Sequence, residues 1–569
     1  MRTFGLRAPA GHRIVGGLLT LGLLASGGLS STVAAGRERF PAARPATRAE
    51  AVELLCGDSE SPAICLRSRL HRTVASPFGQ SPAVHRAVEL LGRGISFAGV
   101  RDFVGADGLV IRYTTDGRAF DRVAPLDADG DGLPDVLQAT AEGLSLARGL
   151  LVGQLELTAP RLSEVVLVEL GNRVDGYLLP ARGRDGGAVL VLDATPAGGI
   201  DGARHTAIRQ YGFATALGLG AGLPTGWAEA FANWVSVSIA GVDVGSVELL
   251  SNRLRRLDAG LLDGAPRLTA GNALWFAFVE QAYGLAAVRL TVEELASGAP
   301  VPTALDRAVR RASRDDLASA FREFHVWSLL TGGRADSKHF SFAHQLEFPG
   351  FAATSAGLPA LSVHREPPVA SLGATQIRLA SDELRGGLRV HFEGDFSARW
   401  EVDLLLIAQS GSIHRLPLSL SPEGRGDVTV PLNGLRETLV LVRNLDGESG
   451  TSHRYTYSAH HERTFPYEMT DLDARLVEGS TAGVLISWET GSEQELVGFN
   501  ILRRRADGTA EQPVNPVWVP ALGGAADETS YQFLDRTAEP DIDYAYRIQG
   551  ITTTGLSSFS ESVSVTPSP

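Results

Sequence analysis

The character of the sequence changes at about residue 350, and this change limits the fold more than any other feature. Before it, helical patterns dominate. In residues 246–257, for example, Val247, Leu250, Leu254 and Leu257 form one apolar face, as expected of a helix packed on a core. After it, short runs of strand-forming residues alternate with turns rich in Gly, Ser, Pro and Asp, which is typical of antiparallel β-sandwiches. We therefore expect several domains, with the helices first and the sandwiches last.

The first half also contains strand-like runs ahead of its helices. Residues 109–114, 164–170 and 188–193 have the length and apolar content of strands, and a helix is expected to start at Pro134 and continue over 135–151. Five or more helical patterns follow before residue 330. Strands followed by a block of helices are typical of an α+β domain.

The second half predicts two β units. The expected strands of the first unit are 388–392, 402–408, 427–431 and 438–442, and those of the second are 484–488, 498–503, 544–551 and 557–565. The two units differ in sequence and show no short-period repeat.

Residues 1–35 resemble a secretory signal. Arg2, Arg7 and Arg13 supply the positive start, and 14–24 is an apolar run too short to span a bilayer. The alternative is a signal anchor that stays in place. No later stretch reaches the roughly 18 apolar residues of a membrane helix. We expect a protein that is secreted or on the exterior of the cell envelope, and not membrane-spanning once the signal is removed.

An oxidising compartment bears on the two cysteines. Cys56 and Cys65 are expected to form a disulfide there, the alternative being two separate buried thiols. They belong to an N-terminal segment, 36–100, that begins as a linker and has helical patterns at 51–55 and 84–91. Whether this segment is removed as a pro-region stays open.

The net charge excludes one class of partner. Lys plus Arg is 52 and Asp plus Glu is 65, so the full chain carries −13. The signal removes three Arg and no acid, which leaves 49 − 65 = −16. Because nucleic-acid binding needs a basic surface, we expect an extracellular protein or polysaccharide as the partner instead.

An aspartate-rich loop is the first candidate site. Asp127, Asp129 and Asp131 stand at alternate positions, Gly132 follows, and Asp135 occupies the ninth place. Carboxylates at this spacing, with a glycine for the sharp turn, are what a curled calcium loop needs. The sequence therefore gives these four aspartates as candidate calcium ligands.

Two features of this loop leave an alternative open. The twelfth place holds Gln138 and not the bidentate Glu of an EF-hand, although Glu142 stands one helical turn further on. The alternative is an acidic turn that caps the helix starting at Pro134, because carboxylates favour the positive end of a helix.

The second candidate site combines two expected helices. His205 and Arg209 are four residues apart and share a helix face, with Thr206 directly after the histidine. Glu229 follows in a second helical stretch, 227–234. Zinc peptidases place two histidine ligands at this spacing, with a glutamate base after the first. Taken alone, a histidine on a helix such as His205 is more often an ordinary, partly buried histidine with satisfied hydrogen bonds than a metal ligand.

The order of these stretches resembles a family of secreted bacterial zinc metalloproteases of the gluzincin type. Residues 127–135, 205–209 and 227–234 match its Asp-rich segment, its His-Glu-x-x-His helix and its Trp-x-x-Glu helix, and the resemblance spans most of the mature chain. It implies a metallopeptidase-like α+β domain followed by β-sandwiches.

The departures from that family decide the expected activity. The resemblance places the first ligand on His205 and the third on Glu229, but the base falls on Thr206 and the second ligand on Arg209. One His and one Glu do not hold zinc tightly, and a threonine hydroxyl is too weak a base near pH 7. We expect a vestigial zinc site without zinc, in which the always charged Arg209 forms an ion pair with Glu229.

The last unit resembles a fibronectin type III domain. Residues 485–488 supply an inner strand with its core Trp488, and 544–548 supply a strand with a tyrosine pair. Such modules are commonly spacers or adhesive units.

These observations give one prediction of organisation and function. The expected segments are a signal peptide 1–35, a linker and helical segment 36–100, a metallopeptidase-like domain 101–348, a β-sandwich 349–465 and a fibronectin type III-like domain 466–569. The expected function is a catalytically inactive pseudo-peptidase that acts as a binding or scaffold module. One alternative is an active zinc metalloendopeptidase with ligands drawn from His71, His85, His325 and His339. The other is an adhesive envelope protein that binds through its C-terminal β domains.

Overall fold

The computed structural model describes most of the chain after residue 46. The described residues are 47–56, 66, 70, 82–91, 99–105, 108–171, 174–179, 186–354, 358–364, 368–379, 387–408, 413–432, 435–462, 468–477, 483–493, 496–506, 511–522, 529–539, 541–552 and 557–566. The predicted signal peptide, Cys65 and His71 lie outside them.

The described part of the N-terminal segment includes the helices α1 (Arg48–Cys56) and α3 (Pro82–Leu91), which pack against each other. Cys56 is disulfide-bonded, and Cys65 is the other cysteine in the sequence. Arg48 of α1 pairs with Asp121, and the hydroxyl of Tyr177 donates to the Leu91 carbonyl at 2.8 Å, so this segment is tied to the domain that follows.

A mixed five-stranded sheet opens that domain, in the order β1-β2-β3-β5-β4. Its strands are β1 (Val100–Val104), β2 (Val110–Thr114), β3 (Leu162–Val168), β4 (Gly176–Leu179) and β5 (Ala188–Asp193). Strands β2, β3 and β5 are parallel, while β1 and β4 are antiparallel edges. The apolar runs predicted at 164–170 and 188–193 are the central β3 and β5, whose later residues are buried. The four-residue edge strand β4 was not predicted.

Helix α4 (Asp135–Arg148) connects β2 to β3 and continues as a π-helical turn, Gly149–Gln154. It packs closely on α5 (Gly199–Leu219). A Cβ atom at Gly143 would lie 2.7 Å from the Arg204 carbonyl oxygen, so only glycine permits this approach.

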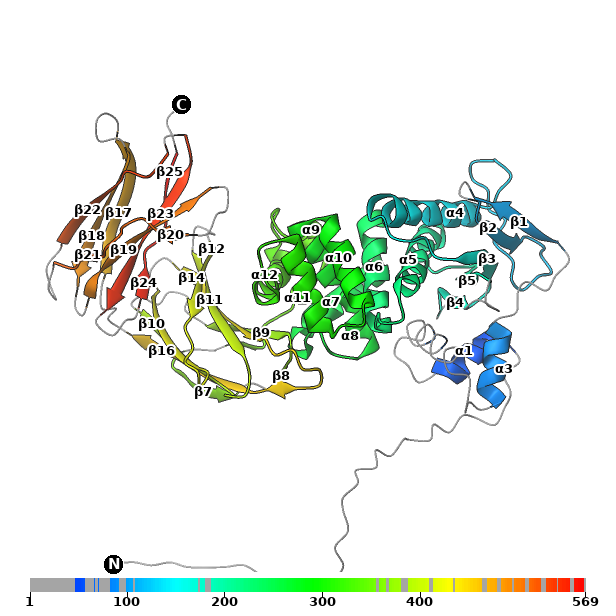
Figure 1. The fold of residues 1–569 in the computed structure, drawn as a ribbon, viewed down its shortest axis with the longest axis horizontal. Helices are drawn as coiled ribbons and strands as arrows, with labels where there is room; N and C mark the ends of the chain where they lie inside the picture. The colour runs from blue at the N-terminus through cyan, green and yellow to red at the C-terminus, as the bar shows by residue number, and fades with distance from the viewer. Residues whose placement is uncertain are drawn as a thin grey trace, which may run out of the picture. The chain divides into compact units, whose positions relative to one another are not determined.

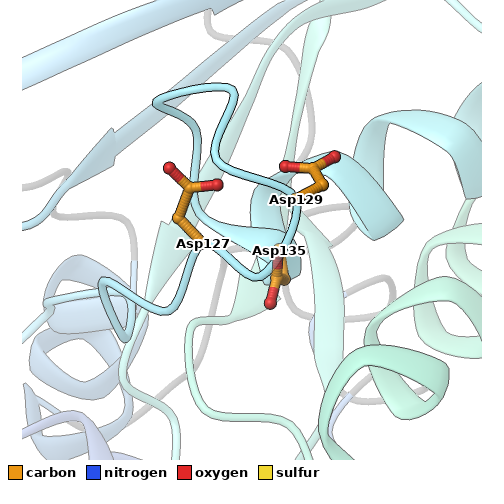
Figure 2. A group of neighbouring side chains, drawn as sticks. All are labelled: Asp127, Asp129 and Asp135. Carbon is orange, nitrogen blue, oxygen red and sulfur yellow. The ribbon is translucent and has the colours of Figure 1, made fainter.

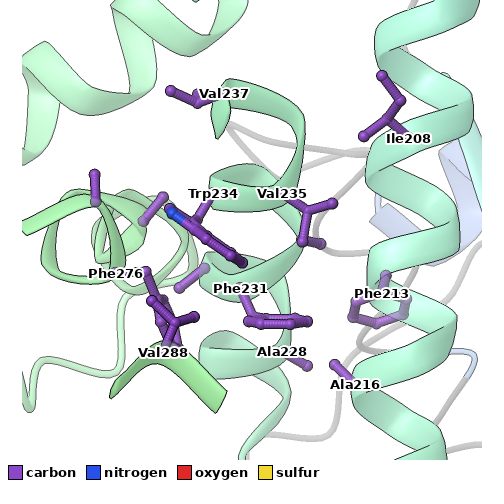
Figure 3. Close-up of a cluster of buried hydrophobic side chains, with 14 of the residues drawn as sticks. Ile208, Phe213, Ala216, Ala228, Phe231, Trp234, Val235, Val237, Phe276 and Val288 are labelled. Carbon is purple, nitrogen blue, oxygen red and sulfur yellow. The ribbon is translucent and has the colours of Figure 1, made fainter. Parts of the chain in front are cut away.

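A block of helices follows the sheet (Figure 1). These are α5, α6 (Thr225–Ala240), α7 (Val244–Arg255), α8 (Pro266–Gly271), α9 (Ala273–Tyr283), α10 (Leu285–Ala296), α11 (Val301–Ala312) and α12 (Leu317–Leu329), with 3-10 turns at Leu257–Ala259, Gly332–Arg334 and Ala343–Gln345. Figure 3 shows the core between α5 and α6, where Phe213 faces Phe231, and Trp234 and Phe276 lie on the other side of α6. The strands and helices together form the α+β arrangement predicted from the sequence.

The next part of the chain is built from sheets that are antiparallel except for the short strand β6, which pairs parallel to β9. One has the order β13-β10-β16-β7 and the other β12-β11-β14-β9-β6, and a small pair joins β15 to β8. The strands are β6 (Ala353–Thr354), β7 (Ala360–His364), β8 (Val369–Ala370), β9 (Gly373–Leu379), β10 (Gly387–Gly394), β11 (Trp400–Ala408), β12 (Ile413–Leu418), β13 (Arg425–Pro431), β14 (Leu435–Asn444), β15 (Ser452–His453) and β16 (Tyr455–Glu462). Alternating side chains of both sheets, such as Val390, Phe392, Val402 and Leu404, fill one shared core, as in a sandwich.

The last part repeats this architecture with different strands. The sheets are β17-β18-β22 and β20-β19-β23-β24, with β21 paired to β19 and β25 to β23. The strands are β17 (Glu468–Val477), β18 (Gly483–Ser492), β19 (Leu496–Arg505), β20 (Gln512–Pro513), β21 (Val519–Pro520), β22 (Thr529–Asp535), β23 (Tyr544–Thr552), β24 (Ser557–Phe559) and β25 (Val563–Val565). Trp488 stacks on Tyr531 at 5.1 Å in the core, and the hydroxyl of Tyr546 donates to Asp535 at 2.9 Å.

Helix α12 packs on the first sandwich. Val326, Leu329 and Leu330 form an apolar cluster with residues of β11 and β14. Beside this cluster, Arg443 of β14 is fully buried and pairs with the equally buried Asp403 of β11. Among the described residues, no helix combines the length and the apolar character needed to cross a bilayer.

Candidate functional site

His205 lies on α5 and faces α6. Its side chain is buried, and Nδ1 is 3.0 Å from the hydroxyl of Ser236 on α6. This contact holds the imidazole ring between the two helices. Thr206, at the predicted position of the general base, is also buried.

Arg209 lies one turn after His205 on the same face of α5. Its guanidinium forms an ion pair with Asp175, which directly precedes the edge strand β4. The next residue, Gln210, donates from Nε2 to the Gly176 carbonyl at 3.2 Å. Two consecutive side chains therefore tie α5 to the beginning of β4. Asp175 belongs to no motif, so the sequence carried no signal for this partner.

Glu229 lies in the first half of α6 and is 1% exposed. It lines a cavity of about 420 Å³, whose wall also includes Pro224, Trp227, Leu261 and Asp263. The ion pair predicted between Glu229 and Arg209 stays a prediction; the structure shows Arg209 in an ion pair with Asp175.

Asp243 is a charged neighbour that the sequence reasoning missed. It precedes α7 and accepts from the Ser246 backbone N–H at 2.7 Å, as an N-cap residue does. Burial acts to raise the pKa of Asp243, but the hydrogen bonds from Ser246 and the electrostatic effect of His205 and Arg209 outweigh it and hold that pKa below its usual value. The sequence marks Asp243 as a helix cap but not as a neighbour of the α5 side chains.

The residues at the position where the sequence predicted a vestigial zinc site do not fit a zinc ion. Tight sites use at least three His, Cys, Asp or Glu ligands whose donor atoms converge. In the part of the chain that the structure describes, the group of three such side chains that does converge is in the aspartate loop, and neither His205 nor Glu229 belongs to it. The position one turn after His205 is held by the guanidinium of Arg209, which repels cations.

Of the histidines considered as substitute zinc ligands, two have other partners and two have side chains that the structure does not describe. His325 is buried between Gln376 and Arg443. His339 has Nδ1 at 2.6 Å from Asp336. His71 and the side chain of His85 lie outside what the structure describes.

The aspartate loop curls immediately before α4 (Figure 2). Asp127 accepts backbone hydrogen bonds from Gly130, Asp131 and Gly132 at 2.8 to 3.1 Å. One ligand oxygen each of Asp127, Asp129 and Asp135 lies within 4.8 Å of the other two.

The remaining predicted ligands of the loop point elsewhere. Asp131 does not belong to the converging group, and its Oδ2 accepts from the Gln138 amide at 2.6 Å. Glu142, considered as a distant ligand, forms an ion pair with Arg204 of α5 at 2.9 Å. It therefore does not substitute for a twelfth-place glutamate in this arrangement.

Comparisons with known proteins leave the function open. No protein-family model and no curated protein matches the sequence. Among solved structures, a β-1,2-glucanase from Parabacteroides distasonis is 14% identical over 37% of this chain, with a TM-score of 0.12. Chicken CNTN1 FN1–FN3 domains are 13% identical over 30%, and a β-glucuronidase from Bifidobacterium dentium is 12% identical over 34%, both with TM-scores of 0.14. The chain covers only 36%, 54% and 39% of those three chains, respectively, and TM-scores this low carry no argument about its activity.

Proposed function

We propose that this chain is a secreted, metallopeptidase-like protein without peptidase activity, which acts as a binding or scaffold module. Its catalytic-domain counterpart would be the mixed sheet with α4 to α12, and its C-terminal unit would be fibronectin type III-like. The partner class is an extracellular protein or polysaccharide. The observation that carries the proposal is the ion pair between Arg209 and Asp175.

This ion pair supports an inactive site because of where it lies. A zinc peptidase helix carries its second histidine one turn after the first, on the same face. Here that position holds a permanent cation, and its counter-charge is a carboxylate at the edge strand β4. Placing Zn²⁺ next to a guanidinium is electrostatically unfavourable, most of all where both are shielded from water.

The absence of a base on the helix supports the same proposal. Peptide hydrolysis by a metal-bound water needs a group that removes the proton of that water. Thr206 stands at the position where such a group would act, and its hydroxyl does not accept a proton near pH 7. The buried Glu229 and the cavity that it lines are then available for binding rather than for hydrolysis.

Zinc analysis tests this proposal. The purified chain is dialysed against zinc, then against buffer, and its metal content is measured. We expect no stoichiometric zinc in the wild type. The triple variant Thr206→Glu, Arg209→His, Asp175→Asn should gain one zinc per chain. The first two changes restore the base and the second histidine. The third removes the carboxylate of Asp175, which would otherwise be left without the guanidinium that it pairs with.

A matched control tests whether zinc binding depends on this position or only on adding a histidine and a glutamate to α5. Arg204→His with Thr206→Glu adds the same residue types to α5 at a more exposed position, beside Glu142. This control should remain free of zinc. Stoichiometric zinc in the wild type, with peptide cleavage that a chelator stops, would refute the proposal. A triple variant that gains no zinc would mean that the ancestral ligand positions are assigned wrongly.

A further inference from the structure

The loop before α4 gathers negative charge without a described cation. Asp127, Asp129 and Asp135 bring one oxygen each within 4.8 Å of the others. Their described partners are backbone N–H groups and the Gln138 amide, and none of the three forms an ion pair within the described part of the chain. Three carboxylates at this separation repel one another unless a cation lies between them.

Asp135 supplies the observation that points to a ligand. Its side chain is 7% exposed, although residues 128–132 of the loop are exposed. Oδ1 accepts from the Ala128 backbone N–H at 3.0 Å, which joins the two ends of the loop. Oδ2 is shielded from solvent and has no hydrogen-bond partner among the described residues. A buried charged oxygen in this state is costly, and a metal ion in the loop would satisfy it.

We propose that this loop binds one Ca²⁺, with carboxylate oxygens of Asp127, Asp129 and Asp135 as ligands. The donor atoms are all hard oxygens, which suit calcium rather than zinc or copper. The backbone is already curled around them, because Gly130 and Gly132 have positive φ angles of 75° and 87° that other residues rarely adopt. Mg²⁺ needs a smaller, nearly octahedral site and retains its waters, so a loop that offers carboxylate oxygens from three positions suits calcium better.

The helix-capping alternative has less support. An acidic cap would accept hydrogen bonds from the first N–H groups of α4. The residue at the N-cap position of α4 is Pro134, and no side chain caps that helix end. The backbone N–H groups of Leu137 and Gln138 bond to the Pro134 carbonyl instead.

The site also connects to the rest of the domain. Asp135 is the first residue of α4, and Glu142 on the same helix pairs with Arg204 of α5. Bound calcium would therefore hold the start of a helix that supports α5. This inference does not depend on the proposed pseudo-peptidase function, because none of its ligands belongs to the vestigial zinc site.

Calorimetric titration of the purified chain with CaCl₂, after treatment with a chelator, tests the site. We expect one calcium per chain, with a dissociation constant on the order of 10⁻⁴–10⁻³ M because the twelfth-place bidentate glutamate is missing. Equal concentrations of Mg²⁺ should not displace it. Amide hydrogen exchange in residues 127–138 should slow when calcium binds.

Two variants and a control make the result specific. Asp129→Asn removes the charge of an exposed ligand and should weaken binding at least tenfold without affecting folding. Asp135→Asn should also weaken binding while its Oδ1 keeps the Ala128 contact. Asp473→Asn, at an exposed position on β17, removes the same charge elsewhere and should bind as the wild type does. Two results would overturn the proposal. One is the absence of calcium binding at calcium concentrations tenfold above the expected dissociation constants. The other is an Asp129→Asn variant that binds calcium as tightly as the wild type.

Discussion

The buried histidine of α12 predicts how stability depends on pH. His325 is fully buried, with Nδ1 at 3.4 Å from Nη1 of Arg443 and Nε2 at 3.4 Å from the Gln376 side-chain oxygen. Because a guanidinium only donates, Nδ1 accepts and Nε2 carries the hydrogen, so the ring is neutral. Burial and the charge of Arg443 lower the pKa of His325 to about 3, against a smaller opposing effect of the Gln376 hydrogen bond.

The size of the effect follows from the two pKa values. The unfolded chain takes up this proton near pH 6.5, and the folded chain does so only near pH 3. Stability is therefore lost as the pH falls below 6.5, at about 1.4 kcal/mol per pH unit until pH 3 is approached. Between pH 7 and pH 5, His325 should lower the free energy of unfolding by about 2 kcal/mol.

Asp193 should act in the opposite direction. Burial raises its pKa to about 6, although the N–H groups of Leu170 and Thr195 oppose this shift. Below pH 6 the folded state holds a proton that an unfolded aspartate, with a pKa of 3.8, does not. Stability from this group therefore rises as the pH falls, by about 1 kcal/mol between pH 7 and pH 5. The two effects partly cancel in the wild type.

Variants separate the two contributions. Urea unfolding at pH 7, 6 and 5, followed by tryptophan fluorescence, gives the stability of the wild type, His325→Asn and Asp193→Asn. Trp275 lies 5.3 Å from Phe324 and reports on α12. From pH 7 to pH 5, the wild type should lose about 2 kcal/mol relative to His325→Asn and gain about 1 kcal/mol relative to Asp193→Asn. If the free energies of unfolding of wild type and His325→Asn differ by the same amount at pH 7 and at pH 5, the reasoning is refuted.

Two further predictions concern buried groups. Asp403→Asn removes the nearer counter-ion of the buried Arg443 and leaves the more distant Glu401 at 3.7 Å, so it should cost about 3–5 kcal/mol in thermal unfolding. Asp403→Leu combined with Arg443→Met should restore most of the stability. Phe231→Ala opens a cavity between α5 and α6 (Figure 3) and should lower the free energy of unfolding by about 3–5 kcal/mol, measured by urea titration. Phe231→Leu should lower it much less. Equal losses for the two variants would mean that the core collapses around the smaller side chain.

The helices and strands that could be predicted from the sequence are those whose pattern of apolar residues follows directly from their burial. The strand predicted at residues 188–193 is β5 at those bounds, because a strand with neighbours on both sides is apolar over most of its length, here Ala188 to Leu192. The prediction of one strand over 557–565 was wrong: the structure has β24 and β25, separated by a break. At the break, the hydroxyl of Ser560 accepts from the Ile548 N–H at 2.8 Å, so a side chain replaces a backbone partner in the ladder.

Only part of the candidate site could be predicted from the sequence, because some of its contacts depend on topology. The positions of His205 and Arg209 on one face of α5 follow from helical periodicity, which the sequence shows directly. The partnership of Arg209 with Asp175 follows from topology, because β4 returns antiparallel along the edge of the sheet and brings its first residues to α5. No local pattern encodes that return. Similarly, the carboxylate spacing indicated that aspartates would gather in this loop, but not that Asp135 would be the buried member.

The contacts of α5 bear on whether its site needs a metal. In a zinc site, the ion links the helices that supply its ligands, so their arrangement depends on it. Here α5 is linked to α6 through His205 and Ser236, to β4 through Arg209 and Gln210, and to α4 through Arg204. Each link is made between protein groups on a different neighbouring element. If the domain is metallopeptidase-like, as we propose, these links between protein groups would let α5 keep its position after the loss of zinc ligands.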